Sequence, residues 1–405
     1  MADSVSILFV IGSLSVGGAE RHVSTVARSL NRSRWRPEIF TLSGGGYFAP
    51  ELEAAGVPVH VPAFATLSGT SPLARGIRIA LVSSQLLFHL IRHRPQIVHF
   101  FLPASLLLGL PLALATFRPI RVVSRRSLND YQRKRPVLAR MERFLHRWAT
   151  AVLGNSRVVI RQLAEEGVCP GRLRLIYNGV DLDRLLPEST RVATRERLGI
   201  SADALVLVMV ANLIAYKGHT DLLESLSSAR ASLPAGWRLL CVGRDDGIGA
   251  ALRLDAIERG LADNVLWLGE RHDVADILAA SDIGLLCSHE EGFSNAILEG
   301  MAAGLPMIVT DVGGNPEAVL DGETGLVVPP RDRTALSRAL ARLASDDEAR
   351  RRFGLAGQQR VKERFSLTRC VADYESLYEA LMAGIQLSPG NCSLAVRDQA
   401  RTPGP

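Results

Sequence analysis

The sequence predicts an α/β chain of two doubly wound, Rossmann-like domains. Short apolar or β-branched segments alternate with helical patterns over 405 residues, and this alternation is typical of βαβ units with parallel sheets. The segments fall into two series, which predicts two domains. The expected strands of the first series are 5–11, 37–42, 57–61, 96–101, 120–124, 151–153 and 173–176. Those of the second series are 205–211, 237–242, 265–268, 283–287, 306–310 and 325–328.

The turn-forming pair Asn178-Gly179 marks the expected hinge, which should lie within 180–187. A helical stripe follows the second series, and the end of the chain is polar and without periodicity. The expected divisions of the chain are an N-terminal domain over 1–182, a C-terminal domain over 183–365, a final helix over 366–386 and a disordered tail over 387–405.

Composition narrows the functional classes. Hydrophobic residues make up 47% of the chain and charged residues 22%, which is ordinary globular composition. The five cysteines form no C-x-x-C pair, so we expect neither a cysteine zinc site nor a disulfide framework, and we expect a cytoplasmic protein. The sequence has no zinc-finger or RNA-recognition motif, so nucleic acid is not an expected partner.

Charge is distributed unevenly along the chain. Residues 1–180 carry 23 Lys and Arg against 9 Asp and Glu, whereas the remainder carries 24 against 32. The basic first half predicts an anionic partner, such as an anionic membrane surface or a diphosphate lipid. Arginines flank an apolar stripe within 132–150, and this helix is expected either to lie on a membrane surface or to pack on the first sheet. The stripe consists of Val137, Leu138, Met141, Phe144, Leu145 and Trp148.

Residues 100–117 carry no charge over 18 positions, which meets the length criterion for a membrane span. Pro103, Gly109 and Pro111 interrupt this stretch, and it follows an expected strand. A buried strand, turn and helix is therefore predicted in place of a membrane span.

Segment 288–300 has the strongest functional pattern. An expected strand ends before it, a glycine-containing loop follows, and a helix is expected to begin near Ser294. The free N–H groups of a helix N-terminus attract anions, so a diphosphate fits there. Glu299 follows Asn295 by one helical turn, and Glu291 precedes the helix. Both carboxylates are expected either to accept hydrogen bonds from sugar hydroxyls or to complement the helix dipole.

A second phosphate-binding pattern follows the first expected strand. Gly17 and Gly18 open a helix there. Paired glycines at such a position let the backbone approach a phosphate, or they simply make a tight turn.

The motif around Glu291 also carries a family resemblance. The span from Glu291 to Glu299 resembles the E-x7-E signature of family 4 retaining glycosyltransferases, also called glycosyl transferases group 1. Segments 301–314, Asn155-Ser156 and Val180-Asp181 are similar to further segments of that family. The resemblance implies the GT-B fold, in which two Rossmann-like domains face each other across a cleft and a C-terminal helix crosses back to the N-terminal domain. It also implies that the N-terminal domain binds the acceptor and the C-terminal domain binds a UDP- or GDP-sugar.

The resemblance assigns roles to individual residues. Glu299 would hold the ribose hydroxyls of the donor, Glu291 would contact its hexose, and backbone amides over 292–295 would bind the sugar and the diphosphate. The expected donor-binding residues are Gly17, Gly18, Asn212, Lys217, Gly243, Arg244, Arg271, Glu291, Gly292, Phe293, Ser294, Asn295 and Glu299. The expected acceptor-binding residues are His99, Phe101, Arg125 and Arg126, and the expected catalytic residues are Glu291, Lys217 and His99.

Two positions depart from the family pattern. Segment 210–218 resembles G-R-L-x-x-x-K-G, but Asn212 replaces the arginine, so an uncharged amide stands where a cation would stabilise the departing diphosphate. Lys217 keeps the second cation of that motif, or it is a solvated surface lysine. Phe101 replaces the second histidine of an H-x-H strand end. His99, the first histidine, is expected either to line the substrate pocket or to be a hydrogen-bonded core residue.

Asp181-Leu182-Asp183 has the D-x-D spelling of metal-dependent transferases of another fold. Because it follows Asn178-Gly179 at the hinge, we interpret it as a turn. We therefore expect no metal ligands and no obligatory cofactor beyond the nucleotide-sugar co-substrate.

Together with these patterns, the family resemblance implies a retaining glycosyltransferase that moves a hexose from a nucleotide-diphosphate sugar to a saccharide or lipid-linked acceptor. A front-face reaction needs no general base, because the leaving phosphate oxygen takes the acceptor proton. The expected setting is synthesis of cell-surface polysaccharide, lipopolysaccharide or glycolipid, in the cytoplasm or peripherally on the inner face of the membrane. If the Asn212 and Phe101 departures disable the site, the alternative is a non-catalytic sugar-nucleotide-binding or scaffold protein.

Overall fold

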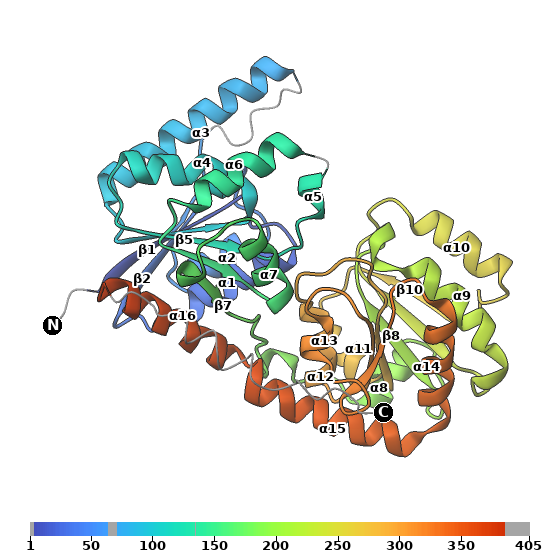
Figure 1. The fold of residues 1–405 in the computed structure, drawn as a ribbon. Helices are drawn as coiled ribbons and strands as arrows, with labels where there is room; N and C mark the ends of the chain where they lie inside the picture. The colour runs from blue at the N-terminus through green and yellow to red at the C-terminus, as the bar shows by residue number, and fades with distance from the viewer. Residues whose placement is uncertain (1–3, 64–70, 134, 385–405) are drawn as a thin grey trace, which may run out of the picture. The chain divides into compact units, whose positions relative to one another are not determined.

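Two parallel sheets organise the chain, one in each of two units (Figure 1). The computed structural model describes residues 4–63, 71–133 and 135–384. Unit 1 combines the chain up to Tyr177 with the residues from Cys370 onward, and unit 2 is Asn178–Arg369. The chain thus leaves unit 1 at Asn178, somewhat before the expected boundary at 182. The expected tail over 387–405 lies outside the described residues.

The sheet of unit 1 has seven strands in the order β3-β2-β1-β4-β5-β6-β7. The strands are β1 (Val5–Ile11), β2 (Trp35–Thr41), β3 (Val59–His60), β4 (Ile97–Phe101), β5 (Ile120–Arg125), β6 (Ala151–Gly154) and β7 (Leu173–Leu175). The strand order reverses between β1 and β4, where Phe9 is the register partner of His99. Doubly wound sheets bind ligands at such a reversal, outside the carboxyl ends of the strands.

The sheet of unit 2 has six strands in the order β10-β9-β8-β11-β12-β13. The strands are β8 (Val206–Val210), β9 (Arg238–Val242), β10 (Val265–Gly269), β11 (Ile283–Leu286), β12 (Met307–Thr310) and β13 (Gly325–Val328). The order reverses between β8 and β11, where Met209 is the register partner of Leu285. Each strand segment expected from the sequence overlaps one of these strands or one in unit 1, so the predicted two-sheet α/β fold is confirmed.

Helices connect the strands of both sheets. Those of unit 1 are α1 (Gly18–Ser29), α2 (Ala49–Ala54), α3 (Pro72–His93), α4 (Leu102–Ala115), α5 (Asp130–Arg133), α6 (Pro136–His146) and α7 (Arg157–Glu165). Those of unit 2 are α8 (Arg191–Arg197), α9 (His219–Ala229), α10 (Gly249–Glu258), α11 (Val274–Ala279), α12 (Asn295–Ala302), α13 (Asn315–Ala318), α14 (Arg333–Ser345) and α15 (Asp347–Arg364). The last helix, α16 (Leu367–Met382), follows α15 directly.

The uncharged stretch over 100–117 forms the end of β4 and helix α4, as predicted. Leu106, Leu110 and Ala113 of α4 are buried in the core of unit 1 together with Phe100. A different helix, α3, is long and apolar enough to cross a membrane by length and composition, and 22% of its apolar window is buried. Helices α3, α4 and α6 lie together on one face of the sheet (Figure 1).

Helix α16 returns the chain to unit 1, which confirms the predicted crossing. The hydroxyl of Tyr374 lies 3.0 Å from Nε2 of His22 on α1, and the hydroxyl of Tyr378 lies 2.8 Å from Nδ1 of His99 on β4. All four side chains are buried. Buried polar groups stabilise a fold only when they are paired, so these two hydrogen bonds specify where α16 docks on unit 1.

Helix α15 carries two buried glycines that face α12 and the turn after it. A Cβ on Gly354 would lie 2.0 Å from the carbonyl oxygen of Gly304, whereas a Cβ on Gly357 would lie 3.6 Å from the Met301 side chain. The first position therefore excludes a methyl group, and the second accepts one at ordinary contact distance.

Gly354→Ala should therefore destabilise unit 2, because overpacking costs about 1–3 kcal/mol and outweighs the gain in helix propensity. Gly357→Ala, three residues away in the same helix, is the matched control. It should be neutral or should stabilise by up to about 1 kcal/mol. Urea unfolding of both variants measures the difference, and equal stability of the two alanine variants would contradict this view of the α12–α15 contact.

Candidate functional site

The strand reversal of unit 2 brings together two side chains predicted from the sequence. Lys217 follows β8 and Glu291 follows β11, and Lys217 Nζ lies 2.5 Å from Oε1 of Glu291. Ser288 Oγ donates to the same carboxylate oxygen at 2.8 Å. The Lys217 and Glu291 side chains are 17% and 10% exposed. Lys217 is therefore not the solvated surface lysine of the alternative interpretation, but one partner of a largely buried ion pair.

Two glycines let the loops around this pair approach one another. Gly218 has a φ of +78°, and a Cβ there would lie 2.0 Å from the carbonyl oxygen of Cys287. Gly313 has a φ of +53°, and a Cβ there would lie 1.7 Å from the carbonyl oxygen of Glu291. Side chains at both positions would be strained by the left-handed backbone and blocked by a carbonyl. The backbone on either side of Lys217 and Glu291 is thereby held in close contact.

Helix α12 begins beside the ion pair, with Ser294 as its N-cap. No side-chain hydrogen bond caps this end of the helix, so its first N–H groups keep the anion-binding character of a helix N-terminus. Nδ2 of Asn178 donates to the carbonyl of Phe293 at 3.1 Å and to Oδ1 of Asn295 at 2.6 Å, which fixes the loop leading into the helix. Glu299, one turn further along, is only 7% exposed.

Asn212, which replaces an arginine of the family pattern, connects two neighbouring loops. Its Oδ1 accepts from the backbone N–H of Arg244 at 3.2 Å, and its Nδ2 donates to Asp246 at 3.2 Å. Arg244 in turn donates to Asp246 at 2.7 Å, directly after the Gly243 turn. The same hydrogen bond and charge raise the pKa of the Arg244 guanidinium. The asparagine therefore organises the loop that holds Arg244. An arginine at this position could not accept the backbone N–H of Arg244, because its side chain has no acceptor atom.

Arg271, the other expected base- or ribose-binding arginine, follows β10 and donates to Asp273 through both Nε, at 2.7 Å, and Nη2, at 2.6 Å. These bonds raise the pKa of the Arg271 guanidinium and lower that of the Asp273 carboxyl. The fork-shaped contact orients the guanidinium while leaving it one-third exposed.

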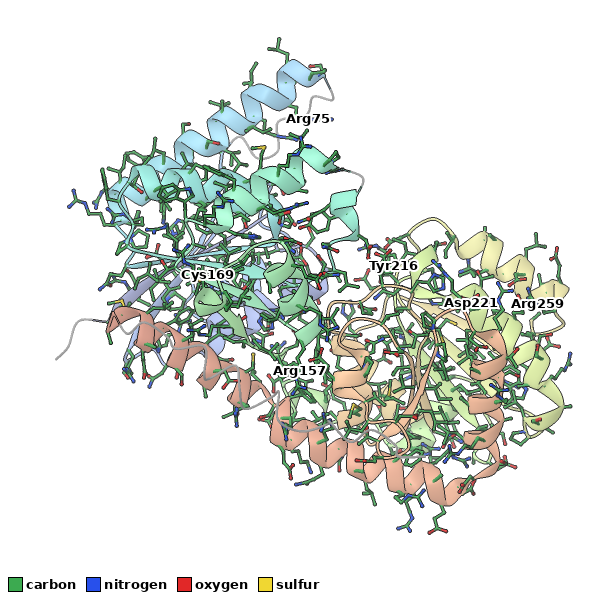
Figure 2. The ribbon with its side chains drawn as sticks, viewed as in Figure 1. Arg75, Arg157, Cys169, Tyr216, Asp221 and Arg259 are labelled. Atoms are coloured by element: carbon green, nitrogen blue, oxygen red, sulfur yellow. The ribbon has the colours of Figure 1, made fainter. Side chains whose placement is uncertain are left out.

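A charged network next to Lys217 was not predicted from the sequence. Nε2 of His289 lies 2.7 Å from Oδ2 of Asp221, and Nε of Arg333 donates to Oδ1 at 2.9 Å. The backbone N–H of His289 also donates to the carbonyl of Tyr216 at 2.7 Å (Tyr216 and Asp221 are labelled in Figure 2). Asp221, His289 and Arg333 line a pocket of about 520 Å³. Its lining residues are Ala215, Gly218, Thr220, Asp221, Ile248, Ala251, Leu252, Asp255, His289, Arg331 and Arg333. In the sequence, only the position of His289 in the same loop as Glu291 could have indicated this network, because Arg333 is remote from that loop.

A buried histidine follows Lys217 and Gly218 in the sequence. His219 is the first residue of α9, it is 2% exposed, and neither ring nitrogen has a hydrogen-bond partner. Burial, and then the nearby Lys217 cation, lower the pKa of the His219 imidazole from 6.5 to about 4. The ring is therefore neutral near pH 7.

The expected residues of unit 1 lie in two different environments. Gly17 is the N-cap of α1 and Gly18 is its first residue, both at the carboxyl end of β1. His99 and Phe101, by contrast, are fully buried on β4. Nε2 of His99 lies 2.8 Å from Ser124 Oγ, and its Nδ1 bonds to α16 as described. Burial lowers the pKa of His99 well below its ordinary value, so the structure places it as the hydrogen-bonded core histidine of the two alternatives.

Arg125 and Arg126, expected to bind the acceptor, are also held by the interior of unit 1. Arg125 is 4% exposed, and its Nη1 and Nη2 donate to the two oxygens of Glu166 at 2.5 and 2.8 Å. Nη1 of Arg126 donates to the hydroxyl of Tyr374 at 3.4 Å. This placement favours a structural role for Arg125, because a buried bidentate ion pair is costly to break.

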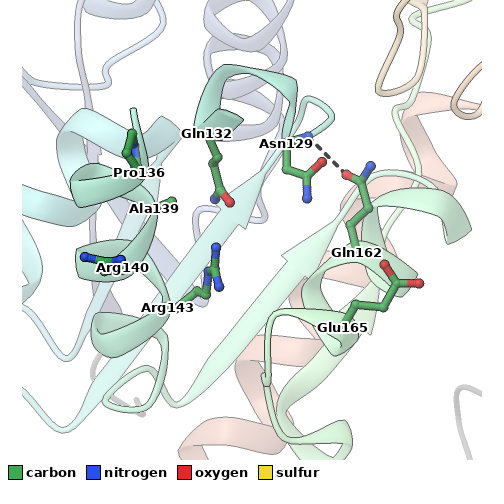
Figure 3. A pocket seen from close by; sticks show the side chains of 8 residues that line it. All are labelled: Asn129, Gln132, Pro136, Ala139, Arg140, Arg143, Gln162 and Glu165. Carbon is green, nitrogen blue, oxygen red and sulfur yellow. Dashed lines mark hydrogen bonds between the residues drawn. The ribbon is translucent and has the colours of Figure 1, made fainter. Parts of the chain in front are cut away.

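Unit 1 also contains a polar pocket that the sequence did not predict. It has a volume of about 570 Å³ and lies between α6 and α7 (Figure 3). The backbone N–H of Asn129 donates to Gln162 Oε1 at 3.1 Å on one side of it, and Arg140 and Arg143 lie on the other. Its lining residues are Asn129, Gln132, Pro136, Ala139, Arg140, Arg143, Gln162 and Glu165. The arginines make it suitable for an anionic ligand.

Comparison with known families and structures identifies similar proteins for both units. Residues 16–184 match the model described as Glycosyltransferase Family 4, and residues 204–346 match the model described as Glycosyl transferases group 1. In fold, the chain is similar to Anabaena HepE in complex with UDP-glucose, with a TM-score of 0.80 at 23% sequence identity over 92% of this chain and 99% of that one. The predicted GT-B fold class is thereby confirmed.

Curated relatives show the same affiliation. The chain is 31% identical to N-acetyl-alpha-D-glucosaminyl L-malate synthase of Bacillus anthracis over 245 residues, which are 60% of this chain and 63% of that protein. It is 27% identical to D-inositol 3-phosphate glycosyltransferase of Streptomyces scabiei over 395 residues, which are 92% of this chain and 88% of that protein. In the Bacillus anthracis protein and in three other relatives at 32% to 34% identity, the matched region spans only 43% to 63% of the relative's own length.

Acidification should destabilise unit 2 through His219. Because its pKa is depressed in the folded chain, the unfolded state binds the proton more tightly, and stability falls as the pH drops from about 6.5 to about 4. The contribution of this one residue is up to about 3 kcal/mol. Urea unfolding at pH 7 and pH 4.5 should therefore show a smaller acid loss in His219→Gln than in the unmodified chain. His272→Gln, at an exposed position, is the control, and the same pH dependence in both variants would refute the assignment.

Proposed function

Because this chain belongs to glycosyltransferase family 4, we propose that it transfers a hexose from a UDP-sugar with retention of anomeric configuration. The observation that carries the proposal is the Lys217–Glu291 pair beside the N-terminus of α12, at the strand reversal of unit 2. A cation, a carboxylate and the N–H groups at a helix N-terminus are the groups that a sugar diphosphate requires. The HepE structure holds UDP-glucose, which supports uridine as the base.

In this proposal the two partners of the ion pair have different tasks. Lys217 stabilises the negative charge that develops on the departing diphosphate, and the backbone N–H groups over 292–295 bind the same phosphates. Glu291 accepts hydrogen bonds from hexose hydroxyls, and Glu299 accepts them from the ribose. The hydrogen bond from Ser288 holds the Glu291 carboxylate in place when Lys217 turns to the phosphate.

The proposed reaction proceeds on one face of the sugar. The bond between the anomeric carbon and the phosphate oxygen breaks, the acceptor oxygen bonds to the same carbon, and its proton passes to the leaving phosphate oxygen. No side-chain base takes part. The burial of His99, with both ring nitrogens engaged, supports this proposal because the residue has no free nitrogen to serve as a base.

Lys217→Ala should lower kcat about 10²–10³-fold with little effect on donor affinity, because the lost cation acts mainly in the transition state. Glu299→Ala should instead weaken donor affinity about 10- to 100-fold through the loss of a charged acceptor. Donor hydrolysis and calorimetric titration, run over a panel of UDP- and GDP-sugars, measure the two effects. Lys362→Ala, an exposed lysine on α15, is the control.

Unchanged turnover in Lys217→Ala would refute the assigned role. Donor binding without turnover in the unmodified chain would instead favour the non-catalytic sugar-nucleotide-binding or scaffold function.

We further propose that the acceptor is a saccharide or lipid-linked saccharide, and that unit 1 binds an anionic membrane surface on the cytoplasmic side. The support is an apolar surface that we define by Val137, Met141 and Phe144 of α6 and by Trp148 just beyond it, all at least 50% exposed. Leu145, placed on the same stripe by helical spacing, is buried instead. The stripe is thus divided: one edge packs inward, and the other remains on the surface.

Helix α3, which packs on α4 as α6 does and lies on the same face of unit 1 (Figure 1), also carries exposed apolar side chains. Leu73 is 74% exposed, Phe88 69% and Ile91 54%. Exposed apolar side chains in such number mark an interaction surface. Arg140 and Arg143 lie next to the α6 residues and line the pocket described above. Aromatic and apolar side chains beside arginines are suited to a headgroup layer.

Purified protein should therefore float with phosphatidylglycerol vesicles at low salt and stay down with neutral vesicles. Replacement of Val137, Met141, Phe144 and Trp148 by serine should reduce flotation at least about tenfold, since each buried apolar side chain contributes about 1.5–3 kcal/mol. Leu254→Ser with Ile257→Ser, two exposed positions on α10 of unit 2, is the matched control. Flotation that is indifferent to vesicle charge and to the α6 substitutions would favour a soluble acceptor.

A further inference from the structure

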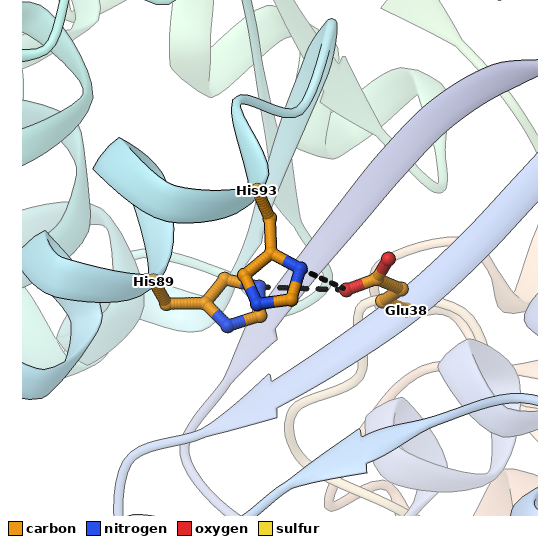
Figure 4. Close-up of side chains that lie close together, drawn as sticks. All are labelled: Glu38, His89 and His93. Atoms are coloured by element: carbon orange, nitrogen blue, oxygen red, sulfur yellow. Dashed lines mark ion pairs between the residues drawn. The ribbon is translucent and has the colours of Figure 1, made fainter.

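Four side chains of unit 1, far from the donor site in sequence and in a different unit, converge on one point. Glu38 lies on β2, His60 on β3, and His89 and His93 lie one turn apart near the end of α3. Figure 4 shows Glu38, His89 and His93 directed toward one another. This site has no part in the proposed glycosyl transfer and is independent of it.

The ligand atoms of the cluster lie close together, although further apart than around a bound ion. His89 Nε2 lies 3.5 Å from Oε2 of Glu38, and His93 Nδ1 lies 4.0 Å from the same oxygen. The three ligand atoms all lie within 4.8 Å of one another. Ligand atoms around a tetrahedral zinc ion are about 3.3 Å apart, given metal–ligand bonds of about 2.0–2.1 Å. To close the set around an ion, the stacked His89 and His93 rings, whose centroids lie 4.2 Å apart, must turn about their side-chain bonds so that both ring nitrogens face it.

The state of His89 is the second observation. The residue is 7% exposed, and its Nε2 has no hydrogen-bond partner although it faces the Glu38 carboxylate. A buried polar atom whose nearest contact is too long for a well-formed hydrogen bond is costly and uncommon in native folds. A cation between this nitrogen and the carboxylate would satisfy both.

We propose that Glu38, His89 and His93 bind a divalent transition-metal ion of the zinc class, with His60 as the residue that positions the Glu38 carboxylate. Imidazole nitrogen with carboxylate oxygen is a ligand set that suits zinc and its neighbours, whereas Mg²⁺ and Ca²⁺ prefer oxygen alone. Two histidines at i and i+4 on a helix project to one side and suit a shared ion. His60 Nε2 lies 3.1 Å from Oε2 of Glu38 and supplies the outer contact that orients a ligating carboxylate.

The site explains how the end of α3 is fixed to the sheet. Of the 22 residues of α3, only Val82, Leu86, His89 and Leu90 are buried, so the helix has a narrow apolar contact with the rest of unit 1. An ion held by β2 and by the last turn of α3 would tie the helix down near His93, whose half-exposed ring also leaves a path for entry. The role is structural: binding energy at a site that forms only in the folded chain stabilises the fold.

Zinc titration of the metal-free full-length chain, prepared by dialysis against a chelator, tests the proposal. We expect one equivalent of Zn²⁺ to bind and to raise the Tm, and Co²⁺ at the same site to give visible absorption bands. His89→Ala and Glu38→Gln should weaken zinc binding at least about 100-fold, and His60→Ala about 10- to 100-fold, the effect typical of an outer-shell partner. His272→Ala, at an exposed position in unit 2, should bind zinc as the unmodified chain does.

His93→Ala keeps the test decisive if His89→Ala fails to fold, because the His93 ring is 44% exposed and its loss perturbs the core least. Zinc binding of equal affinity in the unmodified chain, His89→Ala and His93→Ala would overturn the proposal, since the ion would then lie elsewhere. The complete absence of zinc binding would also overturn it and would leave the cluster as a histidine–carboxylate contact alone.

Discussion

The parallel direction of the strands described in both sheets is the constraint on which the rest of the structure depends. Parallel strands need a crossover for each pairing, and these crossovers bury both faces of each sheet under helices. They also bring all carboxyl ends to one edge, so loops distant in sequence meet there. Lys217 and Glu291 are 74 residues apart and yet form a 2.5 Å ion pair, because β8 and β11 are neighbours at the strand reversal. Gly218 and Gly313 then allow the backbone of these loops to come close enough for the pair to form.

The fold was predictable because its signals are local. A strand buried on both faces is a continuous apolar run, as in the expected strand over 205–211. No long-range information is needed to recognise such a run. The Asn178-Gly179 pair likewise marked the passage between the units to within a few residues. The meeting of Lys217 with Glu291 was predictable for a different reason: their motifs occur as a set in one family, and both follow strands that the fold places side by side.

What the sequence could not predict depends on partners remote along the chain. His99 was open to two interpretations because Ser124 and Tyr378, which occupy its two ring nitrogens, come from β5 and from the last helix. Leu145 satisfies the helical spacing of an exposed stripe, and only the position of α6 on the sheet shows that it points inward. The cluster around Glu38 joins residues from two strands and one helix, and only the spacing of His89 and His93 is visible locally. Long-range packing decides each of these cases.

The same packing changes the meaning of the basic charge of the first half. Net charge counts every arginine equally, but a buried cation that is paired internally contributes little to an outside partner. Arg125 forms an ion pair with Glu166 inside unit 1, and Arg28 forms one with Glu51 near the surface of that unit. Arg140 and Arg143, by contrast, are exposed beside both the polar pocket and the apolar side chains of α6. The case for an anionic partner of unit 1 therefore depends on the arrangement of a few arginines around α6, where charge, pocket and apolar surface coincide, and not on the sum of charges along the chain.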